Sequence, residues 1–259
     1  MINLLDSTIA DEPRANRKAL RQHQRTFANL VDQLKRKNRP AIIIFEGWGA
    51  AGKGDIIRLV TARLDPQLYS VFANHRPEGA SANHHYLWRY WQQIPEQGRL
   101  AILDRSWYRR VLIDRIEGTC TQDEWERAYQ EINQLERQFI DFGGLLVKFW
   151  LQISPDEQLR RFESRVNDDS RRWKISQDDW RRRDRWSEVQ GAVDDMLAAT
   201  STVYAPWTVI DSDSKFQSYT RTLQVLEKSF TDELADKPAK LATMNRGKKK
   251  KRASQKPGP

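Results

Sequence analysis

A glycine-rich turn near the N-terminus has the composition of a phosphate-binding loop. Residues 47–54 read Gly-Trp-Gly-Ala-Ala-Gly-Lys-Gly, which matches a glycine, four residues and then Gly-Lys. Glycines let consecutive backbone N–H groups point toward phosphate oxygens, and the lysine adds a mobile positive charge. An apolar run precedes the turn and a helical pattern follows it, as such a site requires. We expect phosphate to be bound by Gly47, Trp48, Gly49, Ala50, Ala51, Gly52, Lys53 and Gly54.

A second apolar run, residues 100–103, ends on an acid and a base. Asp104 at the end of a buried strand can bind Mg²⁺ directly or through water. The guanidinium of Arg105 can clamp a transferring phosphate group in two places. Other phosphate loops have Ser or Thr after the lysine to hold Mg²⁺, and Gly54 cannot do this. The predicted catalytic residues are therefore Lys53, Asp104 and Arg105, with Asp104 as the metal ligand. Without the glycine loop, an Asp-Arg pair at the end of a strand would be equally typical of an ordinary surface ion pair.

Residues 159–186 form a strongly basic segment, with ten Lys or Arg against six Asp or Glu. Arg161 and Arg165 are four positions apart, so on a helix they share one face. A basic lid over a phosphate loop excludes water and supplies cations to the transition state. The alternative is a solvated helix with many i,i+4 ion pairs. We expect a lid at about residues 155–187, with phosphate contacts from Arg161, Arg165, Arg172 and Lys174.

Apolar runs alternate with helical patterns along most of the chain. This alternation predicts an α/β fold, a three-layer α/β/α sandwich around a parallel sheet. We expect one domain over residues 1–236 and a disordered basic tail over 237–259. The predicted strands are 41–45, 69–73, 100–103, 145–153 and 207–210, and the predicted helices are 13–37, 55–60, 81–93, 124–142, 156–165, 187–199 and 215–234.

Composition narrows the possible locations and partners. The net charge of the 259 residues is +9, but seven basic groups lie in the last fourteen residues, so the rest of the chain is close to neutral. This distribution does not favour a specific nucleic-acid binder, although the tail would attract any polyanion or aid solubility. The single Cys120 excludes an intramolecular disulfide. No apolar run can span a bilayer and the N-terminus is not a secretory signal, so we expect a cytoplasmic protein without a membrane partner.

Taken together, these stretches resemble the polyphosphate kinase 2 family over about residues 11–234. The matching blocks include residues 45–48, 50–54, 86–89, 104–108, 172–174 and 204–207. The resemblance implies a P-loop kinase fold like that of thymidylate kinases, with a helical lid. It also implies phosphoryl transfer between inorganic polyphosphate and a purine nucleoside mono- or diphosphate, with Mg²⁺ or Mn²⁺, in a homo-oligomer (dimer or tetramer). Residues 86–91 are most similar to the branch that phosphorylates AMP, and Arg110 joins the expected phosphate contacts.

One position departs from the family pattern. The family usually has an aspartate where this chain has Gly49, and Asp55 stands where the family often has glycine. Asp55 is therefore a second candidate metal ligand, offered from the first helical turn. Arg109 also replaces a common glycine and adds a cation near Arg105 and Arg110. Three alternatives stay open: a polyphosphate- or nucleotide-binding protein with weakened or lost catalysis, a nucleotide kinase that uses a nucleoside triphosphate as donor, and a nucleic-acid binder that acts through the tail.

Overall fold

Five parallel strands form the centre of the molecule, in the order β2-β3-β1-β4-β5. The structure is a computed structural model that describes residues 13–79 and 83–235. β1, β3 and β4 are buried on both faces, which explains their nearly continuous Ile, Leu, Val and Phe sequences. All five predicted strands are confirmed to within a few residues. They are β1 (Ala41–Gly47), β2 (Tyr69–Ala73), β3 (Leu100–Asp104), β4 (Leu145–Gln152) and β5 (Trp207–Asp211).

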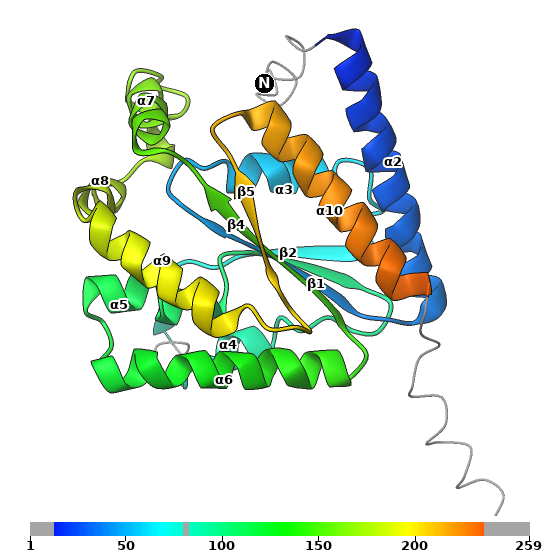
Figure 1. The fold of residues 1–259 in the computed structure, drawn as a ribbon, viewed down its shortest axis with the longest axis horizontal. Helices are drawn as coiled ribbons and strands as arrows, with labels where there is room; N and C mark the ends of the chain where they lie inside the picture. The colour runs from blue at the N-terminus through cyan, green and yellow to red at the C-terminus, as the bar shows by residue number, and fades with distance from the viewer. Residues whose placement is uncertain (1–12, 80–82, 236–259) are drawn as a thin grey trace, which may run out of the picture.

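Helices cover both faces of this sheet, so the predicted three-layer α/β/α architecture is confirmed (Figure 1). One layer holds α2 (Arg14–Lys37), α3 (Lys53–Thr61) and α10 (Lys215–Ala235). The other holds α4 (Trp88–Trp91), α5 (Ile113–Glu117), α6 (Gln122–Asp141) and α9 (Trp186–Thr200). In the first layer, the rings of Phe27 and Phe230 pack edge to face 5.1 Å apart and join α2 to α10. None of the helices in residues 13–79 and 83–235 is long and apolar enough to cross a membrane.

Two further helices stand beyond the carboxyl ends of the strands, between β4 and α9. They are α7 (Pro155–Val166) and α8 (Gln177–Asp184), joined by a 3₁₀ turn over Arg172–Lys174. Ser154 caps α7 and Pro155 opens its first turn, a favourable start for a helix. These elements occupy the segment that the sequence predicts to be a lid.

The predicted helix over residues 81–93 is wrong for the part that the structure describes. Only Trp88–Trp91 is helical, and residues 83–87 form turns and bends. Pro95 disfavours a helical Ile94, which limits the helix at its C-terminal end. The short helices α5 and α8 were not predicted; α8 buries no residue, so it has no apolar period to find. Residues 1–12, 80–82 and 236–259 lie outside the described part, and so does the predicted disorder of the tail.

The strand order places β1 at the point where the connections change direction. β1 pairs with β3 on one side and with β4 on the other. In an open parallel sheet, ligands bind beyond the carboxyl ends of the strands at such a point. The segments that leave β1, β3 and β4 therefore form the expected edge of a binding site.

Candidate functional site

The loop after β1 needs glycine at one position and is strained at another. Gly47 has φ 148°, and a Cβ there would lie 2.6 Å from the carbonyl oxygen of Leu151 on β4. Ala50 adopts a left-handed φ of 61°. The loop ends at Gly52, where α3 begins, so the positive N-terminal end of α3 faces an open cavity of about 540 Å³. This is the geometry of an anion-binding loop.

Lys53 lies in this loop, partly buried and at the wall of the cavity. Its Nζ donates hydrogen bonds to the carbonyl oxygens of Gly47 (2.8 Å) and Trp48 (3.0 Å). Burial, together with the nearby charge of Arg105, lowers the pKa of Lys53 to about 8, although Asp104 and other acids oppose this shift. A partly buried cation next to a helix N-terminus is stabilised by an anionic ligand.

The end of β3 places an acid and a base beside the loop. Asp104 pairs in register with Phe45 of β1, and the backbone N of Arg105 donates to the carbonyl oxygen of Phe45 at 3.1 Å. Arg105 has a left-handed φ of 65°, a strained conformation for a residue with a side chain, and such strain is common at functional sites. The buried carboxylate of Glu46 stabilises this turn, because it accepts hydrogen bonds from N (2.7 Å) and Oγ (2.9 Å) of Ser106. Both Asp104 and Arg105 line the cavity.

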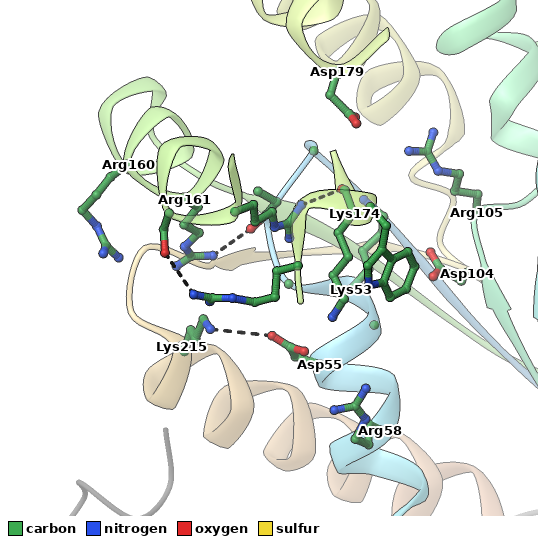
Figure 2. Close-up of a pocket in the computed structure, with 18 residues that line it drawn as sticks. Lys53, Asp55, Arg58, Asp104, Arg105, Arg160, Arg161, Lys174, Asp179 and Lys215 are labelled. Carbon is green, nitrogen blue, oxygen red and sulfur yellow. Dashed lines mark hydrogen bonds and ion pairs between the residues drawn. The ribbon is translucent and has the colours of Figure 1, made fainter. Parts of the chain in front are cut away.

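Helix α7 closes the cavity from the opposite side. Arg161 donates to the carbonyl oxygens of Ala50 (3.0 Å), Ser212 (2.6 Å) and Asp213 (2.9 Å), so it ties α7 to the loop and to the end of β5. Figure 2 shows the resulting pocket, enclosed by α3, α7, α8 and α10. Three carboxylates, Asp55, Asp104 and Asp179, also line it. Its nine cationic side chains are Lys53, Arg58, Arg105, Arg160, Arg161, Arg165, Arg171, Lys174 and Lys215.

A pocket that combines an anion-binding loop with this many cations fits a polyanionic substrate, and comparison with known proteins agrees. A family model described as polyphosphate kinase 2 matches residues 11–238. The chain belongs to the polyphosphate kinase 2 family. It is 43% identical over 213 residues to the polyphosphate:AMP phosphotransferase of Pseudomonas syringae pv. tomato, a match that covers 81% of this chain and 43% of that protein.

Two further relatives match a larger share of their own length. The ADP-polyphosphate phosphotransferase 3 of Rhizobium meliloti is 37% identical over 201 residues, 78% of this chain and 71% of that protein. The crystal structure of polyphosphate kinase 2 from Arthrobacter aurescens superposes with a TM-score of 0.80 at 30% identity, and covers 90% of this chain and 83% of that one. The chain thus spans less than half of the P. syringae relative but most of these two.

In this polyphosphate kinase 2 chain, most of the predicted site residues do meet in one place. Some lie elsewhere. Arg172 is exposed and pairs with Asp169, and the same turn contributes Arg171 to the pocket instead. The guanidinium of Arg110 lies over the ring of Tyr86, 4.7 Å from its centroid, and not in the pocket. Gly47 and Trp48 line a smaller neighbouring cavity, and Ala51 is buried. The predicted residues that line the pocket are Gly49, Ala50, Gly52, Lys53, Gly54, Asp55, Asp104, Arg105, Arg161, Arg165 and Lys174.

The structure adds site residues that the sequence prediction missed. Arg160 and Arg171 belong to the basic segment, but nothing in the sequence separates them from Arg172. Arg58 is one turn along α3 from the loop, so its helical spacing was an available signal. Lys215 is brought to the pocket by α10 from a distant part of the sequence, and no local pattern could reveal it.

The carboxylates of the pocket are its candidate ligands for a divalent cation. Within residues 13–79 and 83–235, no group of three or more His, Cys, Asp or Glu side chains could hold a metal. Mg²⁺ in phosphoryl-transfer sites commonly takes one or two carboxylates and completes its shell with phosphate oxygens and water. Asp104 suits this arrangement because it lies at a strand end beside the loop. Asp55 instead forms an ion pair with Lys215 (3.7 Å) and points toward α10, away from Asp104 (Figure 2).

Proposed function

We propose that this chain is a polyphosphate-dependent nucleotide kinase, which transfers a phosphoryl group between inorganic polyphosphate and a purine nucleoside mono- or diphosphate. The observation that carries the proposal is the pocket itself, where nine cations and the N-terminus of α3 face one cavity. Such an excess of positive charge suits a chain of phosphates better than one phosphate group. The names of the relatives specify AMP in one case and ADP in another. AMP is the first expected acceptor, because that relative shares the higher identity with this chain.

The residues of the pocket can carry out direct in-line transfer. Lys53 releases the loop carbonyls and follows the phosphoryl group, while Arg105 clamps it from the side of β3. Mg²⁺, or Mn²⁺ in its place, would be held by Asp104 and would neutralise charge on the phosphate oxygens. An oxygen of the acceptor phosphate forms the new P–O bond, and the bond to the polyphosphate chain breaks and leaves that chain one phosphate shorter. This oxygen is anionic at neutral pH and needs no base. Accordingly, none of the four histidines, all in the described part, lines the pocket.

The test compares Lys53→Ala and Asp104→Asn with the wild type, using polyphosphate with AMP or ADP and separating products by chromatography. Each variant is expected to lose at least about a hundredfold in rate, since each removes a group that stabilises the transferring phosphate. Lys228→Ala is the matched control, because Lys228 is an exposed lysine on α10 that pairs with nearby Asp232. Near wild-type rates in either site variant would refute the assignment.

The same assay, together with calorimetry, separates two of the three alternatives that the sequence leaves open. A kinase that uses a nucleoside triphosphate predicts product with ATP as donor and none with polyphosphate. A binding protein predicts calorimetric binding of polyphosphate without product. We also propose that residues 155–187 act as the lid and that the protein is a homo-oligomer, a dimer or tetramer, whose mass light scattering would measure.

A further inference from the structure

One carboxylate reaches the pocket from helix α8, in a segment that is otherwise rich in cations. Asp179 lines both the main pocket and the smaller cavity on the other side of Gly49. Its side chain is only 16% exposed, whereas its neighbour Asp178 is 50% exposed. In Figure 2 the Asp179 carboxylate points from α8 into the pocket that Lys53 occupies. Its position is unexpected, because a carboxylate repels the phosphate groups for which the pocket is built.

Asp179 comes close to the loop at a residue that has no side chain. A Cβ on Gly49 would lie 3.3 Å from Oδ1 of Asp179 and 3.3 Å from Cζ of Phe162. Gly49 is not among the residues with positive φ, so its backbone conformation is open to any amino acid. A side chain at position 49 would therefore press Asp179 and Phe162 back by a few tenths of an ångström, while the backbone conformation itself sets no requirement for glycine.

Hydrogen bonds hold the Asp179 carboxylate in this position. Its Oδ2 accepts from N (3.0 Å) and Oγ (2.9 Å) of Ser176, which closes a capping box at the start of α8. Its Oδ1 accepts from Arg182 (3.1 Å), and Arg182 also pairs with Glu117 of α5 (2.8 Å). Burial acts to raise the pKa of Asp179, but the bonds from Ser176 and the charge of Arg182 outweigh it and lower the pKa. Asp179 thus stays anionic, and its charge acts on both Lys53 and Arg165.

We propose that Asp179 is a positioning residue of the transfer site that the lid supplies, and that Gly49 makes room for it. This inference rests on the proposed function. A fixed negative charge here orients the Lys53 ammonium and keeps phosphate oxygens away from the Gly49 side of the loop. Because α8 carries the carboxylate, the site contains it only while α8 packs against the loop. The simpler explanation is that Asp179 only caps α8.

Asp179→Asn separates these explanations, because asparagine keeps an acceptor for the cap and removes the charge. Asp178→Asn is the matched control on the same helix, since Asp178 is exposed and pairs with exposed Arg181. Binding of tripolyphosphate is measured by calorimetry without nucleotide or metal, and kcat is measured with polyphosphate and AMP. Asp179→Asn is expected to bind tripolyphosphate at least about threefold more tightly, because a repelling charge is gone, and to lower kcat at least about tenfold. If Asp179→Asn equals the control in binding and in kcat, the proposal is wrong.

A charge exchange tests the role of Gly49. Gly49→Asp places a second carboxylate against the first and is expected to lower kcat at least about tenfold. The double variant Gly49→Asp/Asp179→Asn returns the site to one negative charge, and its kcat is expected to exceed that of both single variants. A double variant no better than the weaker single variant would overturn the proposal. If the wild type binds tripolyphosphate but forms no nucleotide product, the proposed function fails. The binding comparison of Asp179→Asn with its control then still decides whether the charge of Asp179 acts on phosphate bound in the pocket.

Discussion

A fully buried ion pair lies between the sheet and helix α6 and links four elements. Nζ of Lys148 on β4 lies 2.8 Å from Oε2 of Glu136 on α6, and both side chains have no solvent exposure. Glu136 also accepts hydrogen bonds from Trp107 (3.1 Å) and Tyr108 (2.6 Å), and Lys148 donates to the carbonyl oxygen of Thr200 (2.8 Å). Trp107 and Tyr108 belong to the turn that leaves β3 just after the site. We predict that Lys148→Met is strongly destabilising and that its cost depends on pH.

The magnitude follows from the charge left behind. Burial raises the pKa of Glu136 and Lys148 opposes this shift, so the variant raises it further. Folding with a protonated glutamate costs about 1.4 kcal/mol per pH unit above the unfolded pKa of about 4.3, or about 3.7 kcal/mol at pH 7. The Thr200 carbonyl without its donor adds about 1–2 kcal/mol, for a total of about 5 kcal/mol. The folded variant binds a proton that the unfolded variant releases, so folding becomes easier as pH falls. The total destabilisation by Lys148→Met therefore falls to about 3 kcal/mol at pH 5.5.

The assay is urea unfolding at pH 7.0 and 5.5, followed by circular dichroism. Lys148→Met/Glu136→Gln keeps an acceptor for Trp107 and Tyr108 but carries no buried charge, so it is expected to recover at least about 2 kcal/mol at pH 7 and to lose the pH dependence. Lys228→Met, at an exposed pair, should change the free energy of unfolding by less than about 0.5 kcal/mol. A Lys148→Met cost below about 2 kcal/mol at pH 7, or an equal cost at both pH values, would refute the reasoning.

Three further outcomes are expected. Because the pKa of Lys53 is lowered to about 8, Lys53 loses its positive charge as pH rises through that value. The kcat/KM for polyphosphate should therefore fall above pH 8, and a flat profile to pH 9.5 would contradict this. Arg161→Lys should lower the free energy of unfolding in urea by about 2 kcal/mol because it loses bonds to backbone carbonyls, whereas exposed Arg160→Lys should change it by less than about 0.5 kcal/mol. The rings of Trp48 and Trp186 stack with their centroids 3.7 Å apart where the lid meets α9, so a movement of the lid would change this stack. Polyphosphate should therefore change tryptophan fluorescence in the wild type and much less in Trp186→Leu. Equal changes in the two proteins would argue against lid movement.

Much of the fold was predictable because its signals are local. The apolar runs of β1, β3 and β4 are continuous because both faces are buried, so residues 41–45, 100–103 and 145–153 identified a parallel sheet. The helix predicted over residues 81–93 was too long because its buried apolar positions, Leu87 and Tyr90, belong to the single short turn around Trp88–Trp91. Helix α8 was missed because Trp180 is its one apolar residue and leaves no apolar period, although Ser176 and Asp179 at capping-box spacing were a usable sign of its start.

The sequence by itself determined that a phosphate loop with Lys53 at its end lies between a strand and a helix. It also determined that Asp104 and Arg105 end a second strand. Both could be found because each motif is a short segment whose chemistry depends on its neighbours in the chain. Only the tertiary structure decided how distant charges combine. It directs Asp55 to Lys215 and places Asp179, from another helix, against Gly49. The physical reason is that the direction of a charged side chain depends on the helices that pack around it, and no local pattern records that packing.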